Sequence, residues 1–204
     1  MAATQLDMVR RKPSQRRSRD TVGAILEATA RVLVAEGAAA ASTNRIAKVA
    51  GVGIGTLYQY FASREEILRA LGLQHAAEMT ALLAAHAAPL GGAPPEVAVP
   101  AFVDALAAAH AHAPKLHIAL VEAMLANGAG MYKLTHDPGR ALVRAWLEQQ
   151  RGRIRPKDLD AAASLLTCTV EAAIHSQIIE DPARLSDPAW RAELVDLVLR
   201  YLVP

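Results

Sequence analysis

The sequence predicts an all-α fold of about nine helices, and three observations carry that prediction. Alanine, the residue with the highest helix propensity, is very common, whereas aromatic residues make up only 4% of the chain. Apolar residues recur at the three- and four-residue spacing of a helix face, and β-branched runs are short. Turn and cap residues divide the chain into segments of helical length, and none reads convincingly as a strand.

The first part of the chain divides into an arm and a helix. Residues 1–17 contain Pro13 and several arginines with almost no apolar periodicity, so we expect a disordered basic arm. A helix is predicted from about Ser18 to Gly37, because glycine is a favoured residue just past a helix end.

Two short helices should follow, separated by a turn rich in glycine. The first is expected to begin with Thr43 as its N-cap and to end at Gly51, and the second to reach Phe61. Gly51, Gly53 and Gly55 read G-x-G-x-G after a helix, which fits neither a dinucleotide-binding loop nor a Walker loop. A small residue four positions before Gly51 suits the close crossing of a helix-turn-helix. An ordinary helical hairpin is the alternative on spacing alone.

The remaining helices are predicted from cap and break signals. Ser63 and Glu66 form the S-x-x-E pattern of a capping box, which should start a long helix that reaches about Ala87. The break "PLGGAPP" separates it from five further helices, whose bounds follow from proline, glycine and aspartate. These are expected near 96–112, from Pro114 to "NGAG", from Asp137-Pro138 to Gly152, from about Pro156 to Glu180, and from Asp187-Pro188 to about Leu202.

Charge is distributed unevenly along the chain. Residues 1–72 contain eleven Lys or Arg against six Asp or Glu, whereas residues 73–204 contain eleven against fourteen, so the front half is expected to meet a polyanion. The single cysteine, Cys168, excludes an intrachain disulfide and favours a cytoplasmic location. No apolar stretch approaches the ~18 residues of a membrane span, and the basic N-terminus lacks the apolar region of a secretory signal. We therefore expect no membrane partner.

The sequence offers no convincing catalytic or metal-binding constellation. No Ser/His/Asp or Cys/His arrangement is supported by spacing, so an enzyme is not expected. His110, His112 and His117 are close in the chain, but His112 is out of phase with the other two, and no Cys-x-x-Cys or His-Glu-x-x-His motif accompanies them. We therefore predict no metal site and no cofactor.

The stretch from Ser42 to Phe61, continued by "ASREEIL", resembles the DNA-binding motif of the tetracycline-repressor (TetR) family. The matching features are Thr43, Ile46-Ala47, Gly51-Val52, Gly55-Thr56-Leu57-Tyr58, Tyr60-Phe61 and the acidic-apolar start of the next helix. The resemblance implies a three-helix DNA-binding domain over 18–75, with the helix-turn-helix at about 42–61. It also implies a larger helical domain over 76–204 for ligand binding and dimerisation, where the match is only in helix count.

The resemblance implies how the DNA-binding half works. The helix from Ile54 to Phe61 would enter the major groove with its first residues at base edges, and Arg64 matches a position that usually touches phosphate. The arginine-rich arm would add backbone or minor-groove contacts, with a solvated tail as the alternative. The expected DNA-binding residues are Thr43, Asn44, Arg45, Ile54, Gly55, Thr56, Tyr58, Gln59, Tyr60 and Arg64. For the two tyrosines, packing in the small core is the alternative.

The second domain is expected to dimerise, because specific binding needs two motifs about 34–36 Å apart or a multiple of it. The expected interface residues are Leu166, Val170, Ala173, Ile174, Trp190, Leu194, Leu197, Val198 and Tyr201. The resemblance also implies a pocket for a largely apolar small molecule, lined by Phe102, Leu106, His117, Leu120, Met124, Trp146, Gln149, Leu166 and Thr169. Core packing is the alternative for both sets.

These expectations describe a sequence-specific transcriptional regulator. We expect a homodimeric repressor that a small-molecule ligand releases from double-stranded operator DNA, with the long helix from Ser63 carrying the coupling. Repression rather than activation follows from the family's habit. An architectural DNA-binding protein with the same head and no small-molecule signal is the alternative.

Overall fold

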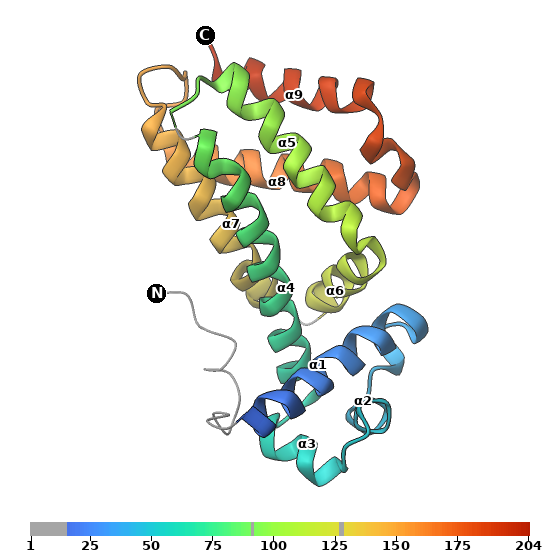
Figure 1. The fold of residues 1–204 in the computed structure, drawn as a ribbon. Coiled ribbons are helices and arrows are strands. Elements are labelled where there is room, and N and C mark those ends of the chain that lie inside the picture. Colours follow the sequence, from blue (N-terminus) through green and yellow to red (C-terminus); the bar gives the residue numbers. More distant parts are fainter. Residues whose placement is uncertain (1–15, 91, 127–128) are drawn as a thin grey trace. The chain divides into compact units, whose positions relative to one another are not determined.

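The structure is a computed structural model that describes residues 16–90, 92–126 and 129–204. Within these stretches the chain forms nine α-helices and short 3-10 turns without a strand, so the predicted all-α fold is confirmed (Figure 1). The chain divides into two compact units. The N-terminal unit is Met1–Ala76 with Lys115–Thr135, and the C-terminal unit is Ala77–Pro114 with His136–Pro204.

The predicted basic arm, residues 1–17, lies almost wholly outside the described residues. Its last two residues, Arg16 and Arg17, are helical, because α1 extends over Arg16–Glu36 and so begins two residues before the predicted start.

The N-terminal unit is built around α1, α2 (Thr43–Ala50) and α3 (Ile54–Tyr60). The first part of α4 (Arg64–Ala87) and most of α6 (Pro114–Ala126) complete it. α1 packs against α2, and α2 packs against α3. Five large side chains have no exposed surface, and each stabilises the fold by roughly 1.5–3 kcal/mol on burial. They are Ile25, Ile46, Leu57, Phe61 and Ile67.

The turn between α2 and α3 depends on Gly51. Its φ of 68° is in the left-handed region, and its N–H bonds to the carbonyl oxygens of Ala47 and Lys48 at the end of α2. A side chain in this conformation is strained, which explains why glycine closes the helix. The prediction that Gly51 ends the first short helix is confirmed.

The caps of α2 and α4 differ in how well they were predicted. Ser42, rather than Thr43, is the N-cap of α2, because the Ser42 hydroxyl accepts a bond of 3.3 Å from the N–H of Arg45 and Thr43 is already helical. At α4 the capping box is confirmed. Ser63 Oγ accepts from the N–H of Glu66 at 3.3 Å, and the Glu66 carboxylate accepts from the N–H of Ala62 at 2.7 Å.

The C-terminal unit contains the end of α4, α5 (Pro95–His112), most of α7 (Ala129–Gln149), α8 (Leu159–Glu180) and α9 (Pro188–Leu202). α5 packs against both α8 and α9, and Figure 1 shows its first turns near the end of α9. An ion pair joins α9 to α5: Arg191 Nη1 on α9 donates to Asp104 Oδ1 on α5 at 3.0 Å.

Two predicted helix starts, those of α7 and α8, are wrong. α7 begins at Ala129 and continues through Pro138, so Asp137 does not cap a helix there and instead accepts from Arg140 at 2.9 Å. A proline inside a helix removes one backbone bond, and the packing of a long helix can outweigh that local loss. α8 begins at Leu159, where Asp158 accepts from two backbone N–H groups, rather than near Pro156.

α8 is, among the described residues, the one helix long and apolar enough to cross a membrane by length and composition alone. The sequence prediction that no stretch approaches such a span is therefore too strong. A single helix of this kind is weak evidence, since core helices have the same properties, and several α8 side chains, including Leu166, Val170 and Ile174, are buried in the unit.

Candidate functional site

α3 presents a mixed apolar and polar face to solvent. Tyr60 is only 7% exposed, whereas Ile54 and Tyr58 are 39% and 45% exposed. Gly55 and Gln59 are exposed beside them. These four outward residues are spaced i, i+1, i+4 and i+5, so they share one side of the helix. A Cβ added at Gly55 would meet nothing within 4 Å, so the backbone there is open to a partner surface.

A hydroxyl pair joins α2 to this face. Thr43 Oγ1 at the start of α2 lies 3.2 Å from the phenolic oxygen of Tyr58, and either group can donate. Asn44, the next residue of α2, is exposed, and Thr56 is half-buried on α3. The structure therefore brings Thr43 and Tyr58 together from two helices.

Arg45 is held by Glu36 at the end of α1. Arg45 Nε donates at 2.9 Å and Nη2 at 2.7 Å to the two carboxylate oxygens of Glu36. This hydrogen bonding lowers the pKa of Glu36, since the ionised carboxylate is the better acceptor. The pair lies at the surface, so it contributes little stability, but it fixes the direction of the guanidinium.

Two residues predicted to bind DNA lie elsewhere. Tyr60 packs in the core of the N-terminal unit, so its ring seals that core as the alternative interpretation had it. The Arg64 guanidinium donates to Ala41 O at 3.0 Å and to Ala38 O at 2.6 Å. Arg64 therefore braces the segment between α1 and α2, and neither side chain joins the outward face of α3.

The C-terminal unit contains a cavity that opens to solvent; its empty space, counted together with the solvent at the opening, is about 880 Å³. Five helices contribute to its wall, and nearly every wall residue is apolar. Examples are Leu83 of α4, Phe102 of α5, Trp146 of α7, Val170 of α8 and Val198 of α9. Such a wall favours a ligand with a large apolar body.

The predicted pocket residues fall into two groups. Phe102, Leu106, Trp146 and Leu166 line the cavity, whereas Gln149 and Thr169 are exposed and are not part of its wall. His117, Leu120 and Met124 belong to the N-terminal unit. Leu120 and Met124 are in its core, and His117 Nδ1 lies 2.8 Å from His75 Nε2.

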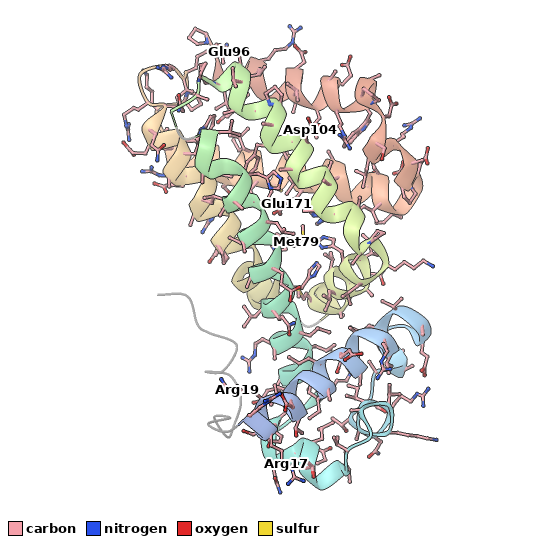
Figure 2. All side chains as sticks on the ribbon, in the orientation of Figure 1. Arg17, Arg19, Met79, Glu96, Asp104 and Glu171 are labelled. Atoms are coloured by element: carbon pink, nitrogen blue, oxygen red, sulfur yellow. The ribbon has the colours of Figure 1, made fainter. Side chains whose placement is uncertain are left out.

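Among the residues that the structure describes, Glu171 is the one ionisable residue in the cavity wall, and Figure 2 labels it among the helices of the C-terminal unit. Its Oε2 lies 3.3 Å from Nε2 of His136 on α7, and only 19% of its side chain is exposed. Burial raises the pKa of Glu171 to about 7. One turn further along α8, burial lowers the pKa of His175 to about 4, with smaller contributions from His110 and His136.

The outer side of α8 and α9 carries exposed apolar residues. Leu165 and Ile179 on α8, and Leu197 and Tyr201 on α9, are large apolar side chains exposed to solvent. Seven of the predicted interface residues are instead partly or fully buried within the unit: Leu166, Val170, Ala173, Ile174, Trp190, Leu194 and Val198. The apolar period of each helix identified its inward side, and the outward side is the one available to a partner.

Sequence reasoning missed Glu36 and Glu171. Glu36 ends α1 nine residues before Arg45, and only the fold brings the two together. Glu171 had a detectable signal, because it is the only charged residue between Asp160 and Glu180 in a strongly apolar segment. An isolated acid in such a segment is a candidate functional group.

Two family models match the chain. Residues 25–71 match the model described as bacterial regulatory proteins, tetR family. Residues 94–202 match the model described as tetracyclin repressor-like, C-terminal domain. No curated protein matches the sequence.

Solved structures share the fold at low identity. SmeT, the repressor of the Stenotrophomonas maltophilia multidrug efflux pump SmeDEF, is 21% identical, with a TM-score of 0.70 over 91% of this chain and 93% of that chain. A SmeT–triclosan complex is 19% identical, with a TM-score of 0.67 over 90% and 92%. The fatty acid degradation regulator FadR from Bacillus halodurans is 18% identical, with a TM-score of 0.68 over 85% and 97%.

The C-terminal model alone covers more than half of the chain, and the N-terminal model spans the helix-turn-helix. The chain belongs to the TetR family of DNA-binding transcription regulators.

Proposed function

We propose that this protein is a homodimeric repressor that binds operator DNA through α2 and α3 and leaves it when a small apolar molecule occupies the C-terminal unit. The observation that carries the proposal is the outward face of α3. Its buried side anchors the helix in the core through Leu57 and Tyr60, while Ile54, Gly55 and Tyr58 face solvent.

The exposed face suits the major groove of DNA. Ile54 can pack on a thymine methyl group, Gly55 allows close approach of the backbone, and Gln59 can bond to a base edge. The hydroxyls of Thr43 and Tyr58, paired at 3.2 Å, can bond to a phosphate. Arg17 and Arg19, exposed at the start of α1 in Figure 2, add positive charge to the same unit.

A dimer would supply the two reading helices that an operator requires. The outward residues Leu165 and Ile179 of α8 and Leu197 and Tyr201 of α9 form the surface that we assign to it. Two helices from each protomer would bury these residues in a four-helix arrangement.

The cavity supports ligand-dependent release over the architectural alternative. SmeT, which shares the fold, is a repressor with a structure in complex with triclosan. α4 is one continuous helix whose first part belongs to the N-terminal unit and whose last part, including Leu83, belongs to the C-terminal unit and lines the cavity. A ligand that favours one position of this helix would shift the population of DNA-competent dimers.

The test begins with duplexes selected by the purified protein from a random-sequence library. Ile54→Ala and Tyr58→Ala should each weaken binding to the selected duplex by about tenfold or more, with unchanged circular dichroism. Val34→Ala is the matched control, because Val34 is an exposed apolar residue that belongs to α1 and not to α3. Wild-type affinity in both α3 variants would remove α3 as the reading helix.

A further inference from the structure

We propose that the effector is a lipophilic amine whose apolar body fills the cavity and whose protonated nitrogen is bound by the carboxylate of Glu171. This inference rests on the proposed ligand-binding role of the C-terminal unit. It adds the chemical class of the ligand and the residue that selects it.

The lining of the cavity defines the body of the ligand. The cavity opens to solvent, and the space inside it together with that opening is about 880 Å³. Leu83, Phe102, Val170 and Val198 are typical of its wall, and no Lys or Arg is among the described residues that line it. An apolar body gains from leaving water for this wall, and it needs few polar partners.

The charge of the polar end follows from Glu171. A ligand carboxylate would place a second negative charge in an apolar wall whose described residues include no Lys or Arg to neutralise it. A neutral ligand would fill the space and leave the carboxyl group as it is. A protonated amine would pair with the carboxylate, and their mutual attraction would offset the loss of hydration of both groups.

The surroundings of Glu171 leave room for such a partner. Among the described residues, His136 on α7 is its partner, at 3.3 Å from Oε2, which leaves Oε1 for a ligand. Thr167, one turn earlier on the same side of α8, also lines the cavity, and its buried hydroxyl has no hydrogen-bond partner within the described part of the chain. An ammonium group has three donors. It can therefore donate to Oε1 of Glu171 and, after rotation of the Thr167 side chain, to the Thr167 hydroxyl.

Histidines surround this part of the wall, and one of them, His175, is neutral near pH 7. His136 from α7, His175 from α8 and His110 from α5 surround this part of the wall, and the lining residues of α4 and α9 add no charge. Burial lowers the pKa of His175 to about 4, so this ring is neutral. Because the pKa of Glu171 is about 7, its carboxyl group ionises at little cost once a cation arrives.

The experiment compares three probes with the same alkyl chain: decylamine, decanol and decanoate. Their binding to the full chain is measured by calorimetry and by fluorescence, since Trp146 is in the cavity wall. Wild type should bind decylamine at least about tenfold more tightly than decanol, and decanoate most weakly. Decylamine affinity should rise as pH increases through about 7, because Glu171 loses its proton there.

The variant Glu171→Gln should lose the preference for decylamine and its pH dependence while binding decanol as wild type does. Glu193→Gln, which removes an exposed carboxylate from α9, should retain both. Equal or tighter binding of decanol or decanoate by wild type would overturn the amine assignment and leave the ligand-binding role intact. If none of the probes binds, the amine assignment also fails. The proposed function fails as well only if no compound in a wider screen releases the protein from the selected duplex.

Discussion

Replacing Glu171 by glutamine should stabilise the folded protein at neutral pH and above. The carboxyl group lies in an apolar wall, and burial raises its pKa from the ordinary 4.5 to about 7. Glutamine has nearly the same shape but carries no charge, so the variant escapes the cost of ionising a buried acid. At about 1.4 kcal/mol per pKa unit, the gain is on the order of 2–3 kcal/mol, after allowance for the lost contact with His136.

The effect depends on pH with a definite sign. Below pH 4.5 the carboxyl group is protonated in the folded and unfolded states, so Glu171 carries no cost. Between 4.5 and about 7 only the unfolded chain releases the proton, so this residue lowers the free energy of unfolding as pH rises. His175 acts in the opposite direction, because its pKa falls from 6.5 to about 4 and its burial is costly as pH drops through that range.

The two contributions have opposite signs in the wild-type protein between pH 4.5 and 6.5. Glu171→Gln should reveal the His175 contribution, so that the free energy of unfolding rises with pH across this window. Urea unfolding followed by circular dichroism, at fixed protein concentration and over a pH series, measures both slopes. Glu193→Gln is the surface control. The argument that Glu171 is desolvated would be refuted by either of two results for Glu171→Gln. The variant could be as stable as wild type at every pH, or it could be less stable by an amount that does not change with pH.

Three further predictions concern other parts of the chain. Gly51→Ala should destabilise the protein by about 1 kcal/mol, because φ is 68° there, and thermal unfolding measures the loss. Leu197→Glu should shift the proposed dimer to monomer in light scattering, since it places a charge on the apolar outer face of α9; an unchanged dimer would exclude that face. Glu36→Gln should release Arg45 from its ion pair and steepen the salt dependence of DNA binding, whereas an unchanged slope would show that Arg45 remains remote from phosphate.

The elements that the sequence predicted well are those fixed by local chemistry. Gly51 ends α2 because few other residues adopt its φ, and Ser63 with Glu66 caps α4 through bonds that span only a few residues. The helix-turn-helix could be predicted from the sequence for the same reason. The start at Asp137-Pro138 was wrong because the outcome depends on whether packing of α7 outweighs one missing backbone bond, and that balance is not local.

The site was harder to predict because it depends on which helices meet. Most of α6, with His117, Leu120 and Met124, belongs to the N-terminal unit although it follows α5 of the C-terminal unit. Apolar spacing does not indicate which unit such a helix joins. On α8 the apolar stripe through Leu166 and Val170 is buried, whereas Leu165 is exposed. Which side of α8 is exposed depends on the helices that pack against it, and apolar spacing alone does not identify them.

Glu171 is expected to lower the stability of the fold while it provides selectivity for the ligand, so one variant can test its role. A purely structural acid stabilises the fold, so its replacement by glutamine would lower the free energy of unfolding and disturb the binding of every probe alike. A desolvated acid kept for ligand selection does the reverse, because the folded protein bears a cost that only the bound cation offsets. Glu171→Gln should therefore be more stable than wild type at neutral pH and yet unable to distinguish decylamine from decanol. Only the assignment of Glu171 as the charge-selecting residue of the cavity predicts both results in one variant.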